Sequence, residues 1–341
     1  MNSLLPSFPA SQPPSKQKIF KMEPEKNQKF QRQGRMLANR VKKRYQHVKK
    51  RFARQNIEVF RLYDWDIPEI RAVVDWYAGH LVIGEYIRRQ SLPEWLPTMA
   101  GHVAAALDVP MEKVHLKLRR AGKQDGPRYE RLDHTEEKIV VSERDLKFYV
   151  NPADFVDTGL FSDHRDTRMM VRKMAQGRDF VNLYCYTAAF TCAAAMGGAR
   201  STVSVDRSET AIAWARQNLA VNGLLTDANT LVHAHVFDFL KEARQRGTVF
   251  DLAVVDPPSY STTRADDGAF DVLKDHPKLL EAVVSIMRPG GVLFFSTNHQ
   301  RFVPRLSELS VSKAEEITAQ TIPEDYARKN KEIHRCWRIQ V

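Results

Sequence analysis

The second half of the chain alternates predicted helices with short apolar strands, and no other feature restricts the possible fold as strongly. Strand-and-helix alternation of this length favours parallel strands joined by right-handed crossovers. We therefore predict a doubly wound α/β domain over residues 161–341. Its helices are predicted over 165–175, 188–196, 208–222, 239–246 and 271–287, and its strands over 180–184, 201–206, 230–235, 250–256 and 292–298.

Residues 31–160 predict a second, smaller α+β domain that begins with a helix. From residue 33 to 54 there is no proline, and apolar side chains recur at steps of three and four, which is typical of a helix with one apolar face. A helix over 93–108 and strands over 57–64, 72–87, 114–122, 138–142 and 146–150 follow, with a hairpin around Gly122–Gly126. Residues 1–30 contain five prolines and few apolar residues, so we expect a disordered tail there.

Positive charge is concentrated at the N-terminus. The formal net charge of the chain is +11, and residues 1–60 alone carry +12, so the rest is close to neutral. A basic segment beside a neutral globule indicates binding to a polyanion, although a solvated tail that aids solubility is the alternative. The basic side chains that we expect to contact RNA phosphates are Arg35, Arg40, Lys42, Lys43, Lys49, Lys50, Lys117, Arg119 and Arg120.

Composition also bears on location and on metals. No stretch approaches the roughly 18 uncharged apolar residues of a membrane-spanning helix, and the first residues lack the apolar core of a signal peptide. The cysteines Cys185, Cys192 and Cys336 form neither a metal-binding spacing nor an even disulfide set. We therefore expect a cytoplasmic protein with no membrane association and no metal.

The residues that close the predicted strands indicate the cofactor, because ligands of open α/β sheets bind at the carboxyl ends of the strands. Asp206 ends the second strand, where a carboxylate would hold a ribose diol, and Asp238 follows the third, where it would accept from an adenine amine. The first strand is followed by Thr187-Ala188-Ala189 instead of the glycine-rich phosphate loop of a nicotinamide-dependent dehydrogenase. We therefore predict an S-adenosylmethionine site. Its residues would be Asn182, Tyr184, Tyr186, Thr187, Asp206, Arg207, Asp238, Phe239 and Asp256.

The segment after the fourth strand indicates the methyl acceptor. Two prolines stiffen the exit of the strand, and the ring of Tyr260 offers a surface on which a planar base could stack. The residue after Pro258 is Ser259 and not the cysteine that carbon-5 pyrimidine methylation requires. The predicted catalytic residues are Asp256, Pro257, Pro258 and Tyr260.

Several longer motifs resemble the RlmK family of methyltransferases over residues 33–341. They are NPADFVDTGLFSDHR (151–165), NLYCYTAAF (182–190), DPPSYS (256–261) and EDYARKNKEIHRCW (324–337). The resemblance implies methylation of guanine N7 in helix 74 of bacterial 23S ribosomal RNA. It also implies that Asp163, His164 and Arg165 line the cofactor pocket, with Arg165 a candidate partner of the cofactor carboxylate. The chain would be a free-standing form, with a separate N2-guanine methyltransferase as a possible partner.

Two positions depart from the family. Glycine is usual where Ala188 stands, and leucine is usual where Ser162 stands. Three other functions stay open at this point: methylation of an exocyclic amine or of carbon 5 of a pyrimidine, methylation of a small molecule, and RNA binding without catalysis.

Overall fold

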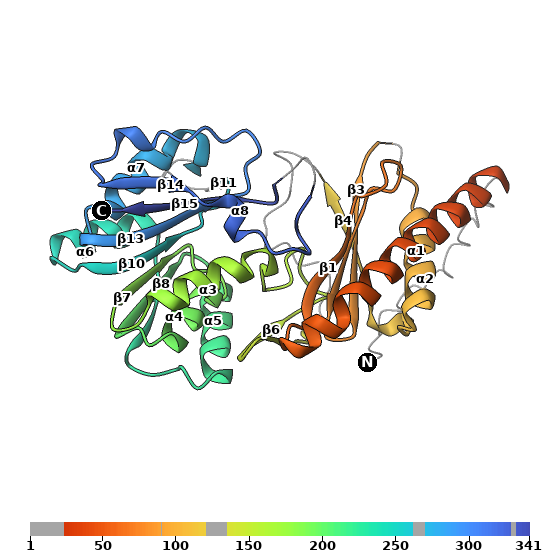
Figure 1. Ribbon diagram of the computed structural model, residues 1–341, viewed down its shortest axis with the longest axis horizontal. Coiled ribbons are helices and arrows are strands. Elements are labelled where there is room, and N and C mark those ends of the chain that lie inside the picture. Colours follow the sequence, from red (N-terminus) through yellow and green to blue (C-terminus); the bar gives the residue numbers. More distant parts are fainter. Residues whose placement is uncertain (1–23, 90, 121–134, 262–269, 329–331) are drawn as a thin grey trace, which may run out of the picture.

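The computed structural model describes residues 24–89, 91–120, 135–261, 270–328 and 332–341. It contains a seven-stranded sheet with helices on both faces and a four-stranded sheet covered by two helices (Figure 1). A hairpin lies between them. The α/β fold predicted from strand-and-helix alternation is confirmed, as is the smaller α+β region before it.

The seven-stranded sheet has the strand order β14-β15-β13-β10-β7-β8-β9. The five strands from β13 to β9 are parallel, as predicted, but β15 pairs antiparallel with β13, and β14 pairs antiparallel with β15. The sequence did not indicate these two strands. The bounds are β7 Asp179–Leu183, β8 Ser201–Asp206, β9 Asn229–His233, β10 Phe250–Val255, β13 Met287–Thr297, β14 Lys313–Glu316 and β15 Arg335–Gln340.

Helices bury both faces of this sheet. Helices α6 and α7 share one apolar core with the strands, and α3 and α4 share another on the opposite face. Strands covered on both sides need continuous apolar runs, and residues 252–255 of β10 and 292–295 of β13 provide them. The helices are α3 Arg165–Met174, α4 Ala189–Met196, α5 Glu209–Val221, α6 Val236–Gln245, α7 Val272–Val284 and the short α8 Thr318–Thr321.

The four-stranded sheet has the order β1-β2-β3-β4 and is covered by α1 and α2. Residues 72–87, predicted as one strand, form β2 and β3, because Ala78 and Gly79 turn the chain with positive φ angles of 46° and 95°. The bounds are α1 Pro24–Arg54, β1 Val59–Asp64, β2 Ala72–Tyr77, β3 His80–Ile87, α2 Trp95–Leu107 and β4 Val114–Arg120.

Helix α1 carries the apolar stripe that its spacing predicts. Leu37, Val41 and Phe52 are buried against α2 and the sheet. The helix begins at Pro24, so residues 24–30, which the sequence assigned to a disordered tail, are helical. Gly34 is required where α1 crosses α2, because a Cβ atom there would lie 2.2 Å from the ring of His102.

The hairpin of β5 (Ile139–Glu143) and β6 (Leu146–Val150) connects the two sheets. Phe148 packs in one cluster with Val59 of the small sheet and with Leu219 of α5. This shared core explains why β1 is buried on both faces. The hairpin predicted around Gly122–Gly126 lies outside the described residues, within which no helix is long and apolar enough to span a bilayer.

Candidate active site

The centre of the seven-stranded sheet holds a topological switch point. Strands β7 and β10 are neighbours; the chain proceeds from β7 outward through β8 and β9, and from β10 outward to β13. Loops that leave β7 and β10 therefore diverge, and the gap between them is where open α/β sheets bind ligands. The predicted site residues after β7, β8 and β10 meet at this edge.

The loop after β7 has an unusual backbone. Tyr184, Tyr186 and Ala188 adopt left-handed φ angles of 58°, 50° and 62°. This conformation costs a residue with a Cβ atom about 1–2 kcal/mol, so glycine is the ordinary choice. Two hydrogen bonds hold it: Ala188 donates its N–H to Cys185, and Tyr186 donates its N–H to Asp206. The backbone therefore keeps the turn of a glycine loop although side chains replace the glycines.

Asp206 joins two loops of the site. Its carboxylate accepts the N–H of Tyr186 at 2.9 Å and the N–H of Ser208 at 2.9 Å. Burial raises the pKa of this carboxyl, while both backbone hydrogen bonds oppose the rise. Each oxygen has a further lone pair, so the carboxylate can still receive two hydroxyl groups of a ribose.

Two of the predicted cofactor residues have structural side-chain roles. Asn182 is buried and donates to Thr191, which bonds Ser204 of β8. Thr187 is buried and donates to the carbonyl of Gly159 at 2.7 Å. Their side-chain polar groups are thus used inside the protein. The cofactor roles of Asn182 and Thr187 stay predictions, and these internal hydrogen bonds favour contact through their backbones.

Arg165 does not reach the cofactor edge. It is 2% exposed, donates to Asp325 at 2.5 Å and also donates to the carbonyl of Val59 in β1. Its predicted contact with the cofactor carboxylate is therefore wrong, since its charge is already paired at the junction with the small domain. No local pattern could have linked Arg165 to Asp325, because the two are 160 residues apart.

The predicted cofactor residues after β8 and β9 lie at the surface or are only partly buried. Asp238 lies in the first turn of α6 and Arg207 follows β8, and both side chains are exposed. Phe239 is half-buried and packs against the sheet core. His235 is the N-cap of α6. Asp238, the predicted acceptor of the adenine amine, therefore lies inside the helix and not directly at the end of β9.

Asp256 stands at the exit of β10, where one of its oxygens accepts a hydrogen bond and the other faces a histidine ring. Ser296 of β13 donates to Oδ1 at 2.7 Å, and Nε2 of His164 lies 3.7 Å from Oδ2. Ser259 donates to the side chain of Asn298 at 2.5 Å, which fixes the loop beyond the two prolines. The side chain of Tyr260 lies outside the described part; its backbone pairs with Asp271.

The three cysteines are buried and unpaired. Burial raises the pKa of Cys192 to about 12 and raises the pKa values of Cys185 and Cys336 well above that of a free thiol. A thiol with a raised pKa holds little of the nucleophilic thiolate. The site is therefore suited to direct transfer and not to covalent catalysis by cysteine.

Comparison with known proteins agrees with this geometry. Residues 67–319 match the model of the S-adenosylmethionine-dependent methyltransferases. The chain belongs to this methyltransferase family. S-adenosylmethionine is accordingly its cofactor, as predicted.

Two relatives of this methyltransferase are informative. It is 38% identical to the ribosomal RNA large subunit methyltransferase K of Neisseria meningitidis, covering 89% of this chain and 86% of that protein. It is 41% identical to methyltransferase K/L of Pseudomonas aeruginosa, but covers only 42% of that protein against 90% of its own length. The resemblance to RlmK is thereby confirmed.

Solved structures share the fold. A methyltransferase complexed with SAH superposes with a TM-score of 0.72 at 23% identity, covering 91% of this chain and 82% of that chain. A SAM-dependent methyltransferase from Streptococcus mutans gives 0.70 at 24% identity, covering 91% and 81%.

A cluster of two histidines and an aspartate lies beside Asp256 in this methyltransferase. Nδ1 of His334 is 3.1 Å from Oδ2 of Asp163, and the rings of His164 and His334 stack 4.1 Å apart at 12°. Their ligand-type atoms lie within 4.8 Å of one another. A metal binds roughly 2.0–2.1 Å from a ring nitrogen and near the ring plane, which two parallel stacked rings cannot both satisfy. His334 was not predicted, since 171 residues separate it from Asp163.

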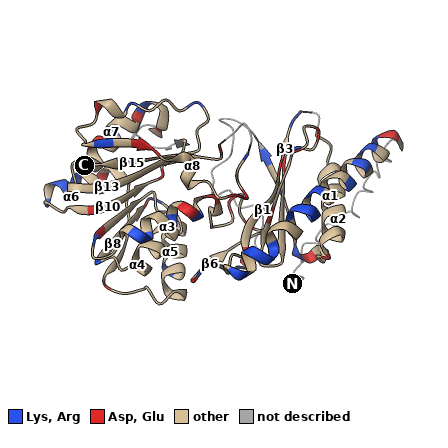
Figure 2. Cartoon of the chain, in the orientation of Figure 1, with Lys and Arg blue, Asp and Glu red and all other residues tan. Residues whose placement is uncertain are grey.

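Basic residues of the methyltransferase are spread along helix α1 (Figure 2). Lys42, Lys43, Lys49 and Lys50 are exposed, as is Arg35. A further predicted contact, Arg40, is exposed but pairs with Asp66 at 2.7 Å.

Strand β4 supplies less of the predicted basic surface. The prediction for Lys117 is wrong: it is 1% exposed, and its ammonium donates to the carbonyls of Ala153 and Phe155. Arg119 is half-buried, and the side chain of Arg120 lies outside the described part.

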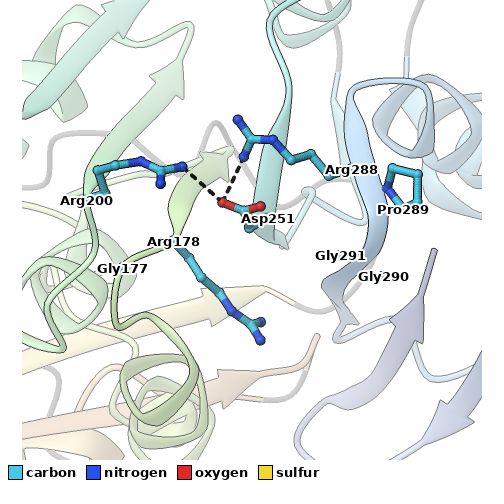
Figure 3. Close-up of a pocket in the computed structure, with 8 residues that line it drawn as sticks. All are labelled: Gly177, Arg178, Arg200, Asp251, Arg288, Pro289, Gly290 and Gly291. Atoms are coloured by element: carbon cyan, nitrogen blue, oxygen red, sulfur yellow. Dashed lines mark hydrogen bonds and ion pairs between the residues drawn. The ribbon is translucent and has the colours of Figure 1, made fainter.

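A pocket of about 430 Å³ lies at the opposite edge of the sheet, near the amino ends of β7, β8 and β10 (Figure 3). Arg200 and Arg288 converge there on Asp251, with which Arg288 forms an ion pair of 2.8 Å. Its charges are largely paired with each other, and it is remote from the switch point. We therefore place neither the cofactor nor the methyl acceptor in this pocket.

Proposed function

We propose that this methyltransferase transfers the methyl group of S-adenosylmethionine to N7 of a guanine in ribosomal RNA of the large subunit, at the helix 74 site that the RlmK resemblance implies. The main support for ribosomal RNA as the substrate is the similarity to methyltransferase K of Neisseria meningitidis over most of both chains. An exposed row of lysines on α1 supports an RNA substrate, because such charges bind phosphates. We place the reaction in the cytoplasm.

The chemistry of the site supports guanine N7 as the acceptor. This nitrogen carries no proton and has a free lone pair, so its attack on the sulfonium methyl group needs no general base. In the described residues, the groups nearest the exit of β10 are the carboxylate of Asp256, the buried imidazole of His164 and the hydroxyl of Ser296. Burial and the charge of His334 lower the pKa of His164 to about 4, so its protonation does not change near neutrality.

Catalysis would then rest on alignment. Asp206 and the loop after β7 would hold the cofactor, while Asp256, Pro257 and Pro258 fix the face at which the base arrives, with Tyr260 proposed as a stacking surface. Proximity and orientation contribute up to about 7–11 kcal/mol in favourable cases. Extracting a base from a duplex costs a few kcal/mol, which phosphate contacts of α1 would offset. Other residues that we propose to contact the cofactor are Asp163, Arg207, Asp238 and Phe239.

The test is a map of N7-methylguanosine in large-subunit ribosomal RNA, made by borohydride reduction and aniline cleavage, from cells with and without this gene. One cleavage site should disappear in the deletion and return with the wild-type chain but not with Asp256→Ala. Purified protein should transfer methyl groups to RNA from the deletion strain at a rate that is nearly flat from about pH 6 to 9. Loss of an exocyclic-amine or carbon-5 methylation instead would contradict the proposal, and the absence of any change would point to RNA binding or a small-molecule acceptor.

A further inference from the structure

Four segments that are distant in sequence meet behind the exit of β10. Asp163 and His164 belong to the 3-10 turn Ser162–His164, Ser296 belongs to β13, and His334 precedes β15. His164 and Ser296 each lie within 4 Å of the carboxylate of Asp256. Asp163 lies within 4 Å of both His164 and His334. The mechanism described above uses Asp256 but assigns nothing to the buried histidines.

Both ring nitrogens of His334 have partners. Nε2 lies 3.0 Å from the hydroxyl of Thr321, which also donates to the carbonyl of Thr318 at 2.8 Å. Nδ1 lies 3.1 Å from Oδ2 of Asp163, so Asp163 and His334 form a hydrogen-bonded pair. Burial raises the pKa of the Asp163 carboxyl, but His164 and His334 oppose it, and the net pKa is lowered.

His164 is held neutral between this pair and Asp256. Its ring is stacked on His334 and meets the ring of Phe190 edge-on at 5.6 Å, and it is 4% exposed. Burial is the main reason that the pKa of His164 falls to about 4. The charges of His334 and Arg168 lower it further, while Asp163 and Asp256 oppose the fall.

A neutral imidazole has one N–H. Nε2 of His164 lies 3.7 Å from Asp256, whereas Nδ1 is buried with no hydrogen-bond partner among the described residues. A proton on Nδ1 would be a buried donor without an acceptor, whereas a proton on Nε2 faces a carboxylate. The tautomer protonated at Nε2 is therefore favoured.

We propose that His164 is a positioning residue for methyl transfer, which holds Asp256 from the side opposite Ser296 and thereby fixes the Pro257–Pro258 face that receives the base. This inference rests on the proposed methyltransferase reaction. The hydrogen-bonded pair of Asp163 and His334 supports the ring of His164, which stacks on that of His334.

The kinetic test compares His164→Leu, which removes the N–H, with His164→Gln, whose amide can present an N–H near the position of Nε2. We expect kcat on ribosomal RNA to fall 10- to 100-fold in His164→Leu, because a displacement of about 1 Å can cost 100-fold. KM for RNA and the Kd for S-adenosylhomocysteine should stay within threefold, and His164→Gln should recover most of kcat. The matched control is His80→Leu, which disrupts the stacked pair of His80 and His115 in the small domain and should leave kcat unchanged.

A double-mutant cycle tests the shared target. If His164 and Ser296 both act by holding Asp256, the effects of His164→Leu and Ser296→Ala on kcat should be less than additive. Full additivity would contradict the proposal. So would a folded His164→Leu variant with kcat within threefold of wild type, or a loss of the same size in His164→Gln.

A second measurement does not depend on the RNA substrate. Nitrogen-15 NMR of the labelled histidine rings should show His164 as the Nε2–H tautomer near pH 7, and His334→Gln should move its titration midpoint upward. A Nδ1–H tautomer, or an unmoved midpoint, would overturn the inference. If the wild-type protein methylated no RNA while both NMR results held, the proposed function would fail and the arrangement of His164 against Asp256 would stand.

Discussion

The guanidinium of Arg165 and the carboxylate of Asp325 form a buried ion pair of 2.5 Å that joins helix α3 to the C-terminal segment. Asp325 also accepts the N–H of Arg61 in β1 at 3.0 Å, so one carboxylate connects three parts of the chain. Nearby, Arg51 of α1 pairs with Glu324, and the ring of Tyr326 lies under the guanidinium of Arg61. The segment 324–328 therefore adds a polar connection between the two domains to the apolar core around Phe148.

Replacing Arg165 by methionine should destabilise the protein strongly. The change leaves the carboxylate of Asp325 buried and without its main countercharge, and breaking a buried pair in this way costs about 3–5 kcal/mol. Urea unfolding at pH 7 measures the loss. Arg246→Ala, which removes an exposed pair with Glu242, is the control and should cost about 1 kcal/mol or less. A folded variant that instead keeps its stability and loses cofactor affinity would restore the rejected cofactor role of Arg165.

Asp206→Ala should weaken binding of S-adenosylmethionine by roughly 10- to 150-fold. Hydrogen bonds to a charged group contribute about 1.5–3 kcal/mol, and the carboxylate also holds the loop after β7 through Tyr186. Calorimetric titration gives the affinity, with Asp227→Ala in the exposed loop before β9 as the control. An unchanged Kd in a folded Asp206→Ala protein would remove Asp206 from the cofactor site.

Reversing the charge of Lys42, Lys43, Lys49 and Lys50 to glutamate should weaken RNA binding and flatten its dependence on salt. Each lost phosphate contact reduces the slope of log K against log salt by about 0.7–0.9. Cofactor affinity should not change. The control reverses four exposed cations elsewhere, Lys173, Arg216, Lys241 and Lys313. Equal slopes for the two variants would mean that α1 does not bind phosphates.

Replacing all three cysteines by alanine should leave the single-turnover rate within about tenfold of wild type, since a lost covalent route would cost far more. The thiols are buried and their pKa values are raised, so little thiolate forms near neutrality. Rapid-quench measurement with saturating enzyme tests this. A covalent RNA adduct trapped by the wild-type protein and absent from the variant would contradict it.

The free energy of unfolding should fall as the pH drops from about 6.5 to 4. The pKa of His164 is about 4 in the folded protein and near 6.5 when unfolded, so between these values only the unfolded chain takes up the proton. The loss attributable to His164 is on the order of 3 kcal/mol. Chemical denaturation at each pH measures it, and His164→Leu should show a shallower decline. An identical slope in that variant would assign the acid sensitivity to other groups.

The sequence predicted the parallel strands well because each one is a short apolar run between helix signals, a pattern with local causes. The position of Asp206 at the end of β8 was predicted for the same reason, since it ends such a run. Arg165 and Lys117 were misplaced because a cation in the sequence does not show whether its partner is solvent, phosphate or a distant acid. Arg165 pairs with Asp325, and Lys117 donates to the carbonyls of residues 153 and 155. Only the folded chain brings these groups together.

The contacts of Asp325 with Arg61 and Arg165 also affect when the chain can finish folding during its synthesis. Arg61 and Asp325 are 264 residues apart, and translation at about 5–20 residues per second separates their emergence by tens of seconds. Throughout that interval β1 and α1 can assemble with their own sheet, and Arg165, once made, stays without its countercharge until residue 325 emerges. A nascent chain paused before residue 324 should therefore lack the buried ion pair between α3 and the C-terminal segment, and competence for catalysis should arrive only with the final stretch of synthesis.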